Sequence, residues 1–340
     1  MRPLFRPALV NDPYGDPALF VDCLFERRAL LFDLGNILAL PPRKILRITD
    51  VFVSHAHMDH FMGFDWLLRI GLGRDRTVSL FGPAGFVAQV EHKLAAYTWN
   101  LVTSYETDFT VLATELLPGG TARRAAFHCR EAFRRRHDED FCIPDGIIHD
   151  SPLFRVHAAI LDHGTPCLGY LLEEKRHVNI WKDRLDELGL PVGPWLRELK
   201  QAILRDEPED APFRAWWREG EHIRSQMRPL GDFKNRLAHI VSGERIGYVT
   251  DIAFHEDNVR RLDALLRGAD RLFIETCFLD EDAARAKEKR HLTARQAGWI
   301  AARVHARQVI PFHISPLYRG REDALRAELA TAFRSSGGAS

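Results

Sequence analysis

The sequence predicts a layered α/β protein in which β-sheets pack against outer helices. Short apolar runs typical of buried strands recur along the whole chain, and segments with apolar residues at helical spacing lie between them. Because the strands occur in clusters and the helices fill the gaps, sheets covered by helices are the expected arrangement. The chain has 340 residues and 46% hydrophobic content, which is ample for one large domain or two small ones.

Most of the expected strands run directly into turn residues or chemically reactive side chains. In layered folds, polar groups at strand ends are where binding and catalytic sites are built. Strands are expected at 29–32, 77–81, 153–161, 167–172, 245–249, 272–274 and 308–312, and helices at 61–70, 84–97, 293–304 and 322–333.

One region differs in character from the rest of the chain. Residues 175–236 are rich in charges of both signs, contain tryptophans and are interrupted by Gly and Pro. We interpret this region as an insertion that projects from the core, part helix and part flexible arm. The core is then formed by residues 1–174 and 237–340. The alternative is an ordinary surface subdomain without a role in substrate binding.

The overall composition excludes several classes of protein. Lys plus Arg and Asp plus Glu both number 47, so any binding of a polyanion must come from local patches. One such patch is 123–136, with six arginines and one acid, although a solvated helix face is the alternative. Five cysteines without a CxxC pair are typical of a reducing compartment. No membrane-spanning run or signal-like amino terminus is present, so a cytoplasmic protein without a membrane partner is expected.

The strongest chemical signal is the segment Ser-His-Ala-His-Met-Asp-His at 54–60, which follows the apolar run 51–53. Imidazole nitrogens and carboxylate oxygens are the ligands that catalytic zinc sites use. A histidine-rich surface loop is the alternative. It is disfavoured because His163, Asp251 and His313 each follow an apolar run in the same way.

Seven ligands are too many for one tetrahedral zinc, so the sequence predicts two Zn²⁺ ions, although Mn²⁺ or Fe could also occupy such a site. Asp251 is expected to bridge them, because a carboxylate can give one oxygen to each metal. Ions about 3.5–4 Å apart lower the pKa of a shared water and neutralise charge on a reacting phosphate. Asp59 is also expected to accept a proton from that water. The predicted ligands are His55, His57 and His163 for one metal, and Asp59, His60 and His313 for the other.

The His-x-His-x-Asp-His motif after a strand resembles the metallo-β-lactamase superfamily. Further segments narrow the resemblance to the RNase Z family, whose members trim the 3′ trailer from precursor tRNA. The matching segments run in family order: 161–170, the Gly-Pro motif at 189–194 with 196–200, 274–277, 291–294 and 313–318.

This resemblance implies a four-layer αββα sandwich, two zinc ions and usually a homodimer. It also implies that the inserted arm, residues 175–236, binds RNA outside the active site. It implies hydrolysis that leaves a 3′-hydroxyl on the tRNA, with Glu275 orienting His291 near the leaving oxygen. Leu317 stands at the family's arginine position, and Arg319 is the candidate to replace its phosphate contact. The substrate contacts implied by the matched motifs are Ser315, Arg319, Gly193 and Pro194.

The expected function is therefore that of a zinc-dependent phosphodiesterase that cleaves precursor tRNA, or another RNA 3′ end, by attack of a zinc-bound hydroxide. The alternative is a hydrolase of the same fold that acts on a small phosphodiester, sulfate ester or lactone. A non-catalytic RNA-binding protein with a vestigial site is disfavoured, because decay should remove ligands first and the set is complete.

Overall fold

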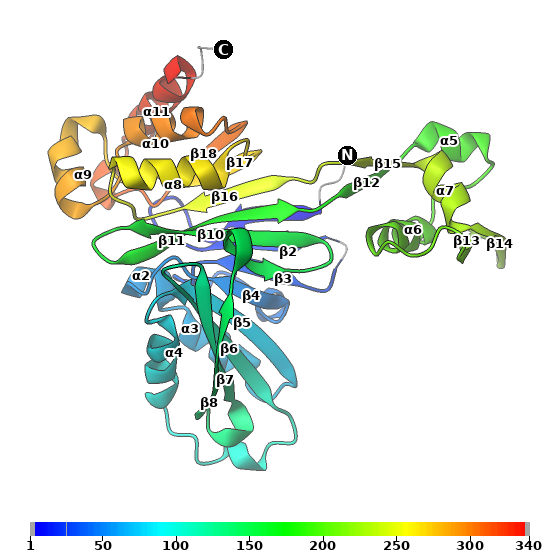
Figure 1. Ribbon diagram of the computed structural model, residues 1–340, viewed down its shortest axis with the longest axis horizontal. Coiled ribbons are helices and arrows are strands. Elements are labelled where there is room, and N and C mark those ends of the chain that lie inside the picture. Colours follow the sequence, from blue (N-terminus) through cyan, green and yellow to red (C-terminus); the bar gives the residue numbers. More distant parts are fainter. Residues whose placement is uncertain (1–3, 25, 337–340) are drawn as a thin grey trace. The chain divides into compact units, whose positions relative to one another are not determined.

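The computed structural model describes residues 4–24 and 26–336. Within them the chain forms two compact units (Figure 1). The larger unit comprises Phe5–His149, Val156–Leu172 and the chain from Arg245 onward. The smaller unit comprises Leu4, Asp150–Arg155 and Glu173–Glu244.

The first sheet has eight strands that lie in the order in which they occur along the chain. The neighbouring strands from β3 to β6 pair in parallel, and the remaining pairs are antiparallel. The strands are β1 (Phe5–Leu9), β2 (Leu19–Cys23), β3 (Ala29–Phe32), β4 (Ile48–Phe52), β5 (Arg76–Pro83), β6 (Phe109–Leu117), β7 (Thr121–His128) and β8 (Arg135–Cys142).

The second sheet has six strands in the order β18-β17-β16-β11-β10-β9. Its strands β16, β17 and β18 pair in parallel, so their carboxyl ends meet at one edge. The strands are β9 (Ile147–Asp150), β10 (Phe154–Asp162), β11 (Pro166–Glu174), β16 (Arg245–Val249), β17 (Arg271–Glu275) and β18 (Gln308–Phe312).

Helices cover the two sheets of the larger unit in separate layers (Figure 1). On the first sheet, α1 (Pro42–Ile45), α3 (Phe64–Gly71) and α4 (Phe86–Ala95) contribute buried side chains to one apolar cluster. On the second sheet, α8 (Glu256–Leu266), α9 (Ala283–Lys289), α10 (Ala294–Arg303) and α11 (Glu322–Ser336) contribute to another.

The sheets meet through aromatic side chains. The Phe32 ring lies 5.8 Å from that of Tyr170 and 5.6 Å from that of Tyr248, measured between centroids. Both tyrosines are fully buried, and Tyr170 donates a hydrogen bond to the Val53 carbonyl. The expected αββα sandwich is confirmed.

The helix expected at 61–70 begins three residues later than predicted, because the turn that follows β3 packs against the chain at Gly63. Helix α2 (Met58–Phe61) is one short turn, and α3 begins at Phe64. The amide of Gly63 donates to the Leu34 carbonyl, and a Cβ at Gly63 would lie only 2.2 Å from the Gly35 carbonyl oxygen. Glycine is therefore required at this close approach, which also fixes the position of α2.

The smaller unit has its own apolar core. Strands β12 (His177–Ile180) and β15 (Ala238–Val241) pair with each other, and β13 (Pro212–Glu219) and β14 (His222–Pro229) form a hairpin. Helices α5 (Lys182–Glu187), α6 (Trp195–Leu204) and α7 (Leu230–Leu237) complete the unit. Its core contains the fully buried Trp195 together with Leu199 and Phe233.

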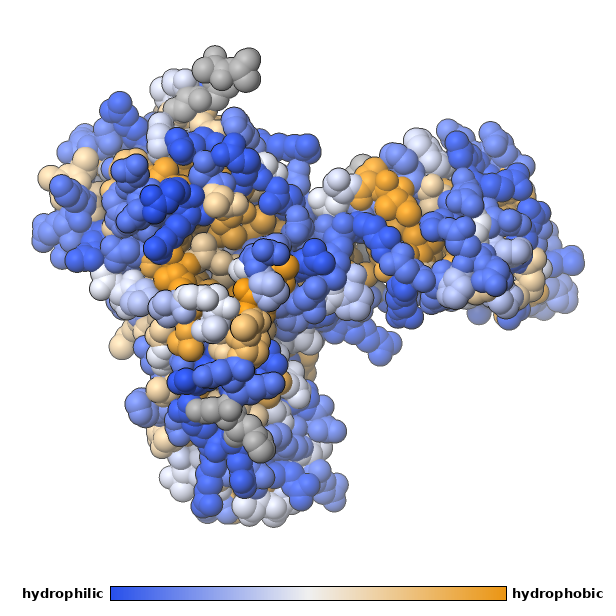
Figure 2. Space-filling model, in the orientation of Figure 1, coloured by the Kyte–Doolittle hydropathy of each residue, from blue (hydrophilic) through white to orange (hydrophobic). Residues whose placement is uncertain are grey.

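The visible surface of both units is mostly hydrophilic, with apolar residues in small groups (Figure 2). None of the helices in the described part of the chain combines the length and the apolar character that crossing a bilayer requires. All five cysteines are free thiols.

Candidate metal centre

The chain brings the predicted ligands together because several strands end at the same edge of the sandwich. His55 and His57 follow β4 of the first sheet, and Asp59 and His60 lie in the short helix α2. The second sheet supplies the other three from the ends of different strands: His163 follows β10, Asp251 follows β16, and His313 follows β18.

Asp251 lies at the centre of this cluster. Its Oδ2 atom is 3.7 Å from His55 Nε2, 3.3 Å from His60 Nε2 and 3.6 Å from His163 Nε2. Its Oδ1 atom is 2.7 Å from His313 Nδ1. One carboxylate therefore faces four imidazoles from both sheets.

The ligand atoms fall into two principal groups. One group contains Asp251 with His55, His57 and His163, and the other contains Asp59 with His60 and His313; within each group the atoms lie within 4.8 Å of one another. The second group adjoins Asp251 through His60 and His313. This is the division of ligands that the sequence predicts for two metals. A third set of atoms joins Asp251 and His313 to Glu275 and His291.

The side chains fit divalent cations. His55 Nε2, His60 Nε2 and His313 Nδ1 are buried and lack a hydrogen-bond partner of adequate geometry in the described part of the chain. Buried polar atoms are almost always satisfied, so three such nitrogens facing one carboxylate indicate a missing partner that accepts lone pairs. Burial and the neighbouring His60 lower the pKa of His55 to about 2, so this imidazole is neutral and its lone pair is available.

The centre also attracts positive charge. Burial alone would raise the pKa of Asp251, but His313 and His60 hold it well below the usual range. Conversely, burial opposes protonation of His313, yet the Asp251 carboxylate raises its pKa to about 10. Asp251 and His313 have φ angles of 47° and 52°, in the left-handed region. Such backbone strain is typical of functional positions.

Asp33, which was not among the predicted site residues, fixes the position of the ligand His60. Its carboxylate is completely buried and accepts hydrogen bonds from the Ser54 amide, the Ser54 hydroxyl and the Tyr248 hydroxyl, at 2.6, 2.9 and 2.8 Å. It also lies 2.9 Å from His60 Nδ1, so the Nε2 atom of that ring is turned toward Asp251. The feature of the sequence that could have identified Asp33 is its position directly after the apolar run 29–32.

Other ring orientations are fixed in the same way. His163 Nδ1 lies 2.8 Å from the carbonyl oxygen of Arg290, and His55 Nδ1 lies 3.0 Å from the Ser54 hydroxyl. Such contacts leave the opposite nitrogen of each ring for the metal and set its tautomer.

Glu275 and His291 form the supporting pair that the sequence analysis expects. Glu275 ends β17, is fully buried and lies 2.8 Å from His291 Nδ1 through Oε2. Its other oxygen accepts hydrogen bonds from the amides of Ile252 and Leu292. The carboxylate is therefore immobile. Burial opposes protonation of His291, but Glu275 raises its pKa above the ordinary value.

The cluster opens into a pocket of about 500 Å³. Ser315 and His291 line it, as does Lys289, which the sequence analysis missed. Arg319 is not among the lining residues, and its guanidinium lies 5.5 Å from the centre of the Tyr14 ring. Lys289 is therefore the cation that faces the cluster.

The remaining candidates lie elsewhere. Gly193 and Pro194 belong to the smaller unit, in the turn that leads into α6. The arginine-rich stretch 123–136 forms β7, a short 3₁₀ turn and the start of β8 rather than a helix. Several of its arginines are paired within the chain: Arg123 with Asp140, Arg135 with Glu91, and Arg136 with Glu131. These pairs weaken the case for a free phosphate-binding patch there.

Comparison with known proteins agrees with this geometry. Residues 9–91 match the family model described as metallo-beta-lactamase superfamily, and residues 233–314 match that described as beta-lactamase superfamily domain. The fold is shared with the metallo-beta-lactamase fold protein YhfI of Bacillus subtilis (16% identity, 97% of this chain and 94% of that chain covered, TM-score 0.53). It is also shared with the short form of human tRNase Z (18%, 93% and 93%, TM-score 0.50).

The fold and the site define a metal-dependent hydrolase of the metallo-β-lactamase superfamily. Ribonuclease Z of Deinococcus radiodurans is 31% identical over 334 residues, which cover 96% of this chain and 96% of that protein. Ribonuclease Z of Anoxybacillus flavithermus is 28% identical, with 93% of this chain and 86% of that protein covered. The chain belongs to the ribonuclease Z family and is an endoribonuclease.

Proposed function

We propose that the protein cleaves the 3′ trailer from precursor tRNA, using two Zn²⁺ ions held by seven ligands, of which Asp251 lies at the centre. The observation that carries the proposal is the convergence of these ligands from two sheets on one carboxylate, next to the fixed Glu275–His291 pair. The relatives' name, ribonuclease Z, supports an RNA substrate.

Each group has a distinct role in this reaction. When bound, the divalent ions would activate water and neutralise charge on the phosphate. Asp59 accepts the proton of the attacking water, because its half-exposed carboxylate lines the pocket directly beside the ligands His60 and His313. His291, held through Nδ1 by Glu275, presents Nε2 to the leaving 3′-oxygen. Ser315 and Lys289 contact the phosphate from the pocket wall.

The smaller unit would act as the arm that binds the tRNA away from the cut, with Gly193 and Pro194 at its contact surface. The proposed arm is 175–236, which lies within the Glu173–Glu244 segment of the smaller unit, and the proposed core halves are 1–174 and 237–340. The proposed assembly is a homodimer. Light scattering on the purified protein measures the assembly.

The direct test is incubation of the purified protein with a precursor tRNA that carries a trailer, with and without a chelator. The proposal requires one cut at the 3′ end of the tRNA, a 3′-hydroxyl on the tRNA and a 5′-phosphate on the trailer, lost with chelator and restored by Zn²⁺. If the purified protein leaves this RNA intact but hydrolyses a small phosphodiester, sulfate ester or lactone, the tRNA assignment is wrong.

Replacing His291 by alanine is expected to lower kcat by about 10²–10⁴-fold, the usual contribution of a positioned general acid. Metal content should stay that of the unaltered protein, because the seven ligands remain. His92→Ala, at an exposed position of α4, is the matched control and should have normal kcat. Normal kcat in His291→Ala would contradict the role of this ring.

Asp33→Asn is expected to weaken metal binding by about 10–100-fold, the usual effect of removing a residue that orients a ligand. Asparagine has one acceptor oxygen in place of the two that now serve Ser54, Tyr248 and His60. Competition with a chromogenic chelator measures the affinity. Tyr248→Phe removes one donor only and should have a smaller effect, whereas unchanged affinity in Asp33→Asn would show that the cluster does not depend on this carboxylate.

A further inference from the structure

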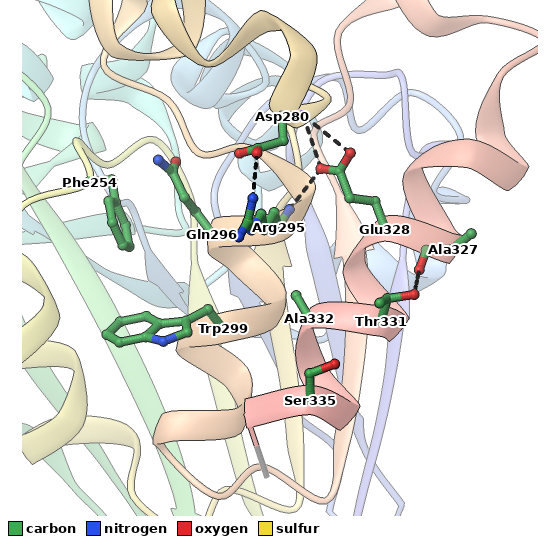
Figure 3. A pocket seen from close by; sticks show the side chains of 10 residues that line it. All are labelled: Phe254, Asp280, Arg295, Gln296, Trp299, Ala327, Glu328, Thr331, Ala332 and Ser335. Carbon is green, nitrogen blue, oxygen red and sulfur yellow. Dashed lines mark hydrogen bonds and ion pairs between the residues drawn. The ribbon is translucent and has the colours of Figure 1, made fainter. Parts of the chain in front are cut away.

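Three cavities of the larger unit adjoin one another through shared lining residues. The first, of about 500 Å³, contains the candidate metal ligands. The second, of about 660 Å³, shares His291 with it. The third, of about 930 Å³, lies between α10 and α11 and shares Phe254 and Gln296 with the second (Figure 3). These shared side chains mark a path that leads away from the reaction centre.

We infer that this path binds the unpaired trailer of the RNA substrate, with its nucleotide nearest the cut in the second cavity and the following bases against Phe254 and Trp299. The inference rests on the proposed function, since it assigns a place to one part of that substrate. Of the residues that form this path, Phe254, Lys287, Arg290 and Trp299 lie outside the segments on which the family resemblance rests.

The second cavity carries the charge that a phosphate requires. Lys287 and Arg290 line it, together with His255 and His291, and Asp162 is the only carboxylate among its lining residues. The Arg290 guanidinium lies 3.7 Å from that carboxylate, and no ion pair of Lys287 is found within residues 4–24 and 26–336. The balance of Lys287, Arg290 and Asp162 is thus positive.

The cationic segment is also held in place. Arg290 follows the last residue of α9 with a φ angle of 59°, and its carbonyl oxygen lies 2.8 Å from His163 Nδ1. One residue further on, His291 is held by Glu275. Lys289 lines the first cavity, and Lys287 and Arg290 line the second. An RNA strand that passes His291 therefore meets cations on both sides of this ring.

The third cavity offers aromatic surface rather than charge. Phe254 is 42% exposed and meets Trp299 edge to face, with 5.8 Å between ring centroids. Figure 3 shows both rings on one side of the cavity, at a distance from the carboxylates of Asp280 and Glu328. Those two acids are engaged: Asp280 pairs with Arg295, and Glu328 accepts from the backbone amides of Asp280 and Arg295.

A cationic subsite followed by exposed aromatic rings is the arrangement that binds single-stranded nucleic acid. A duplex keeps its bases stacked inside the helix and presents none to a ring in a groove, whereas unpaired RNA can splay its bases onto aromatic side chains. The trailer is the part of the substrate that runs past the cut without a pairing partner, so it is the occupant that this path fits.

The test compares two precursor tRNAs that differ only in trailer length, one nucleotide against about six, in steady-state cleavage by the full chain. The longer trailer is expected to lower KM by about tenfold, the effect of one or two stacked bases. Phe254→Leu should remove most of this difference, whereas Phe254→Trp should keep it. Lys287→Gln should raise KM for both precursors, because the nucleotide nearest the cut is present in both. Arg260→Gln removes one charge from an exposed position of α8 outside the three cavities and is the matched control.

The outcomes separate the two proposals. If the unaltered protein cleaves both precursors with the same KM, the trailer path is wrong and the proposed function stands. The path is also wrong if Phe254→Leu raises KM equally for both lengths, because that result indicates a general structural effect. If neither precursor is cleaved, the proposed function fails and the trailer path fails with it.

Discussion

Replacing Asp251 by alanine is expected to abolish metal-dependent hydrolysis. Its carboxylate faces imidazoles of both ligand groups, within 3.7 Å of the ring nitrogens of His55, His60, His163 and His313. Without it, the four rings lose the carboxylate that they share, and Asp59 remains beside His60 and His313 alone. Since a metal ion contributes several kcal/mol to transition-state stabilisation, turnover should fall by about 10³-fold or more.

Elemental analysis of the purified variant should show that the metal is lost together with activity. His57→Ala, which removes a ligand of one group only, should also abolish turnover. Asp257→Ala, at an exposed position in the first turn of α8, is the control and should retain both metal and activity. Normal turnover in Asp251→Ala or in His57→Ala would refute the assignment of the site.

Removal of the arm is expected to weaken cleavage of precursor tRNA strongly but to leave hydrolysis of a small phosphodiester intact. Ile180 and Ala238 are paired directly across β12 and β15, so an Asn-Gly turn can replace Trp181–Leu237 and close the two strands as a hairpin. The excised segment takes nearly all of its own apolar core with it, which limits damage to the rest of the chain. Precursor tRNA cleavage should fall by about 100-fold or more, equivalent to a few stacking or phosphate contacts.

Hydrolysis of bis(p-nitrophenyl) phosphate by the shortened protein should persist, and it serves as the control for an intact metal centre. Gly193→Ala provides a local version of the test, because an added Cβ would lie 3.0 Å from Trp195 Cδ1 and disturb the turn before α6. It should weaken RNA cleavage less than the deletion does. If the shortened protein cleaves precursor tRNA normally, the arm has no role in substrate binding.

Much of the fold follows from local patterns. The apolar runs 29–32, 245–249 and 308–312 coincide with β3, β16 and β18 in their bounds, because a short buried strand is defined by its own residues. The later start of the helix expected at 61–70, which begins at Phe64, could not be predicted from periodicity. It depends on the turn at Leu34 and Gly35, which is distant in sequence but packs against Gly63.

The candidate site divides in the same way. The sequence by itself determined the seven ligand candidates and the Glu275–His291 pair, because each follows an apolar run or belongs to a recognisable motif and because imidazole and carboxylate chemistry is intrinsic to the residue. Only the tertiary structure showed that Asp33 anchors His60. It also showed that Lys289, and not Arg319, lines the pocket at the cluster. Such roles depend on which side chains from distant segments share a cavity, and that is decided by how sheets and helices pack.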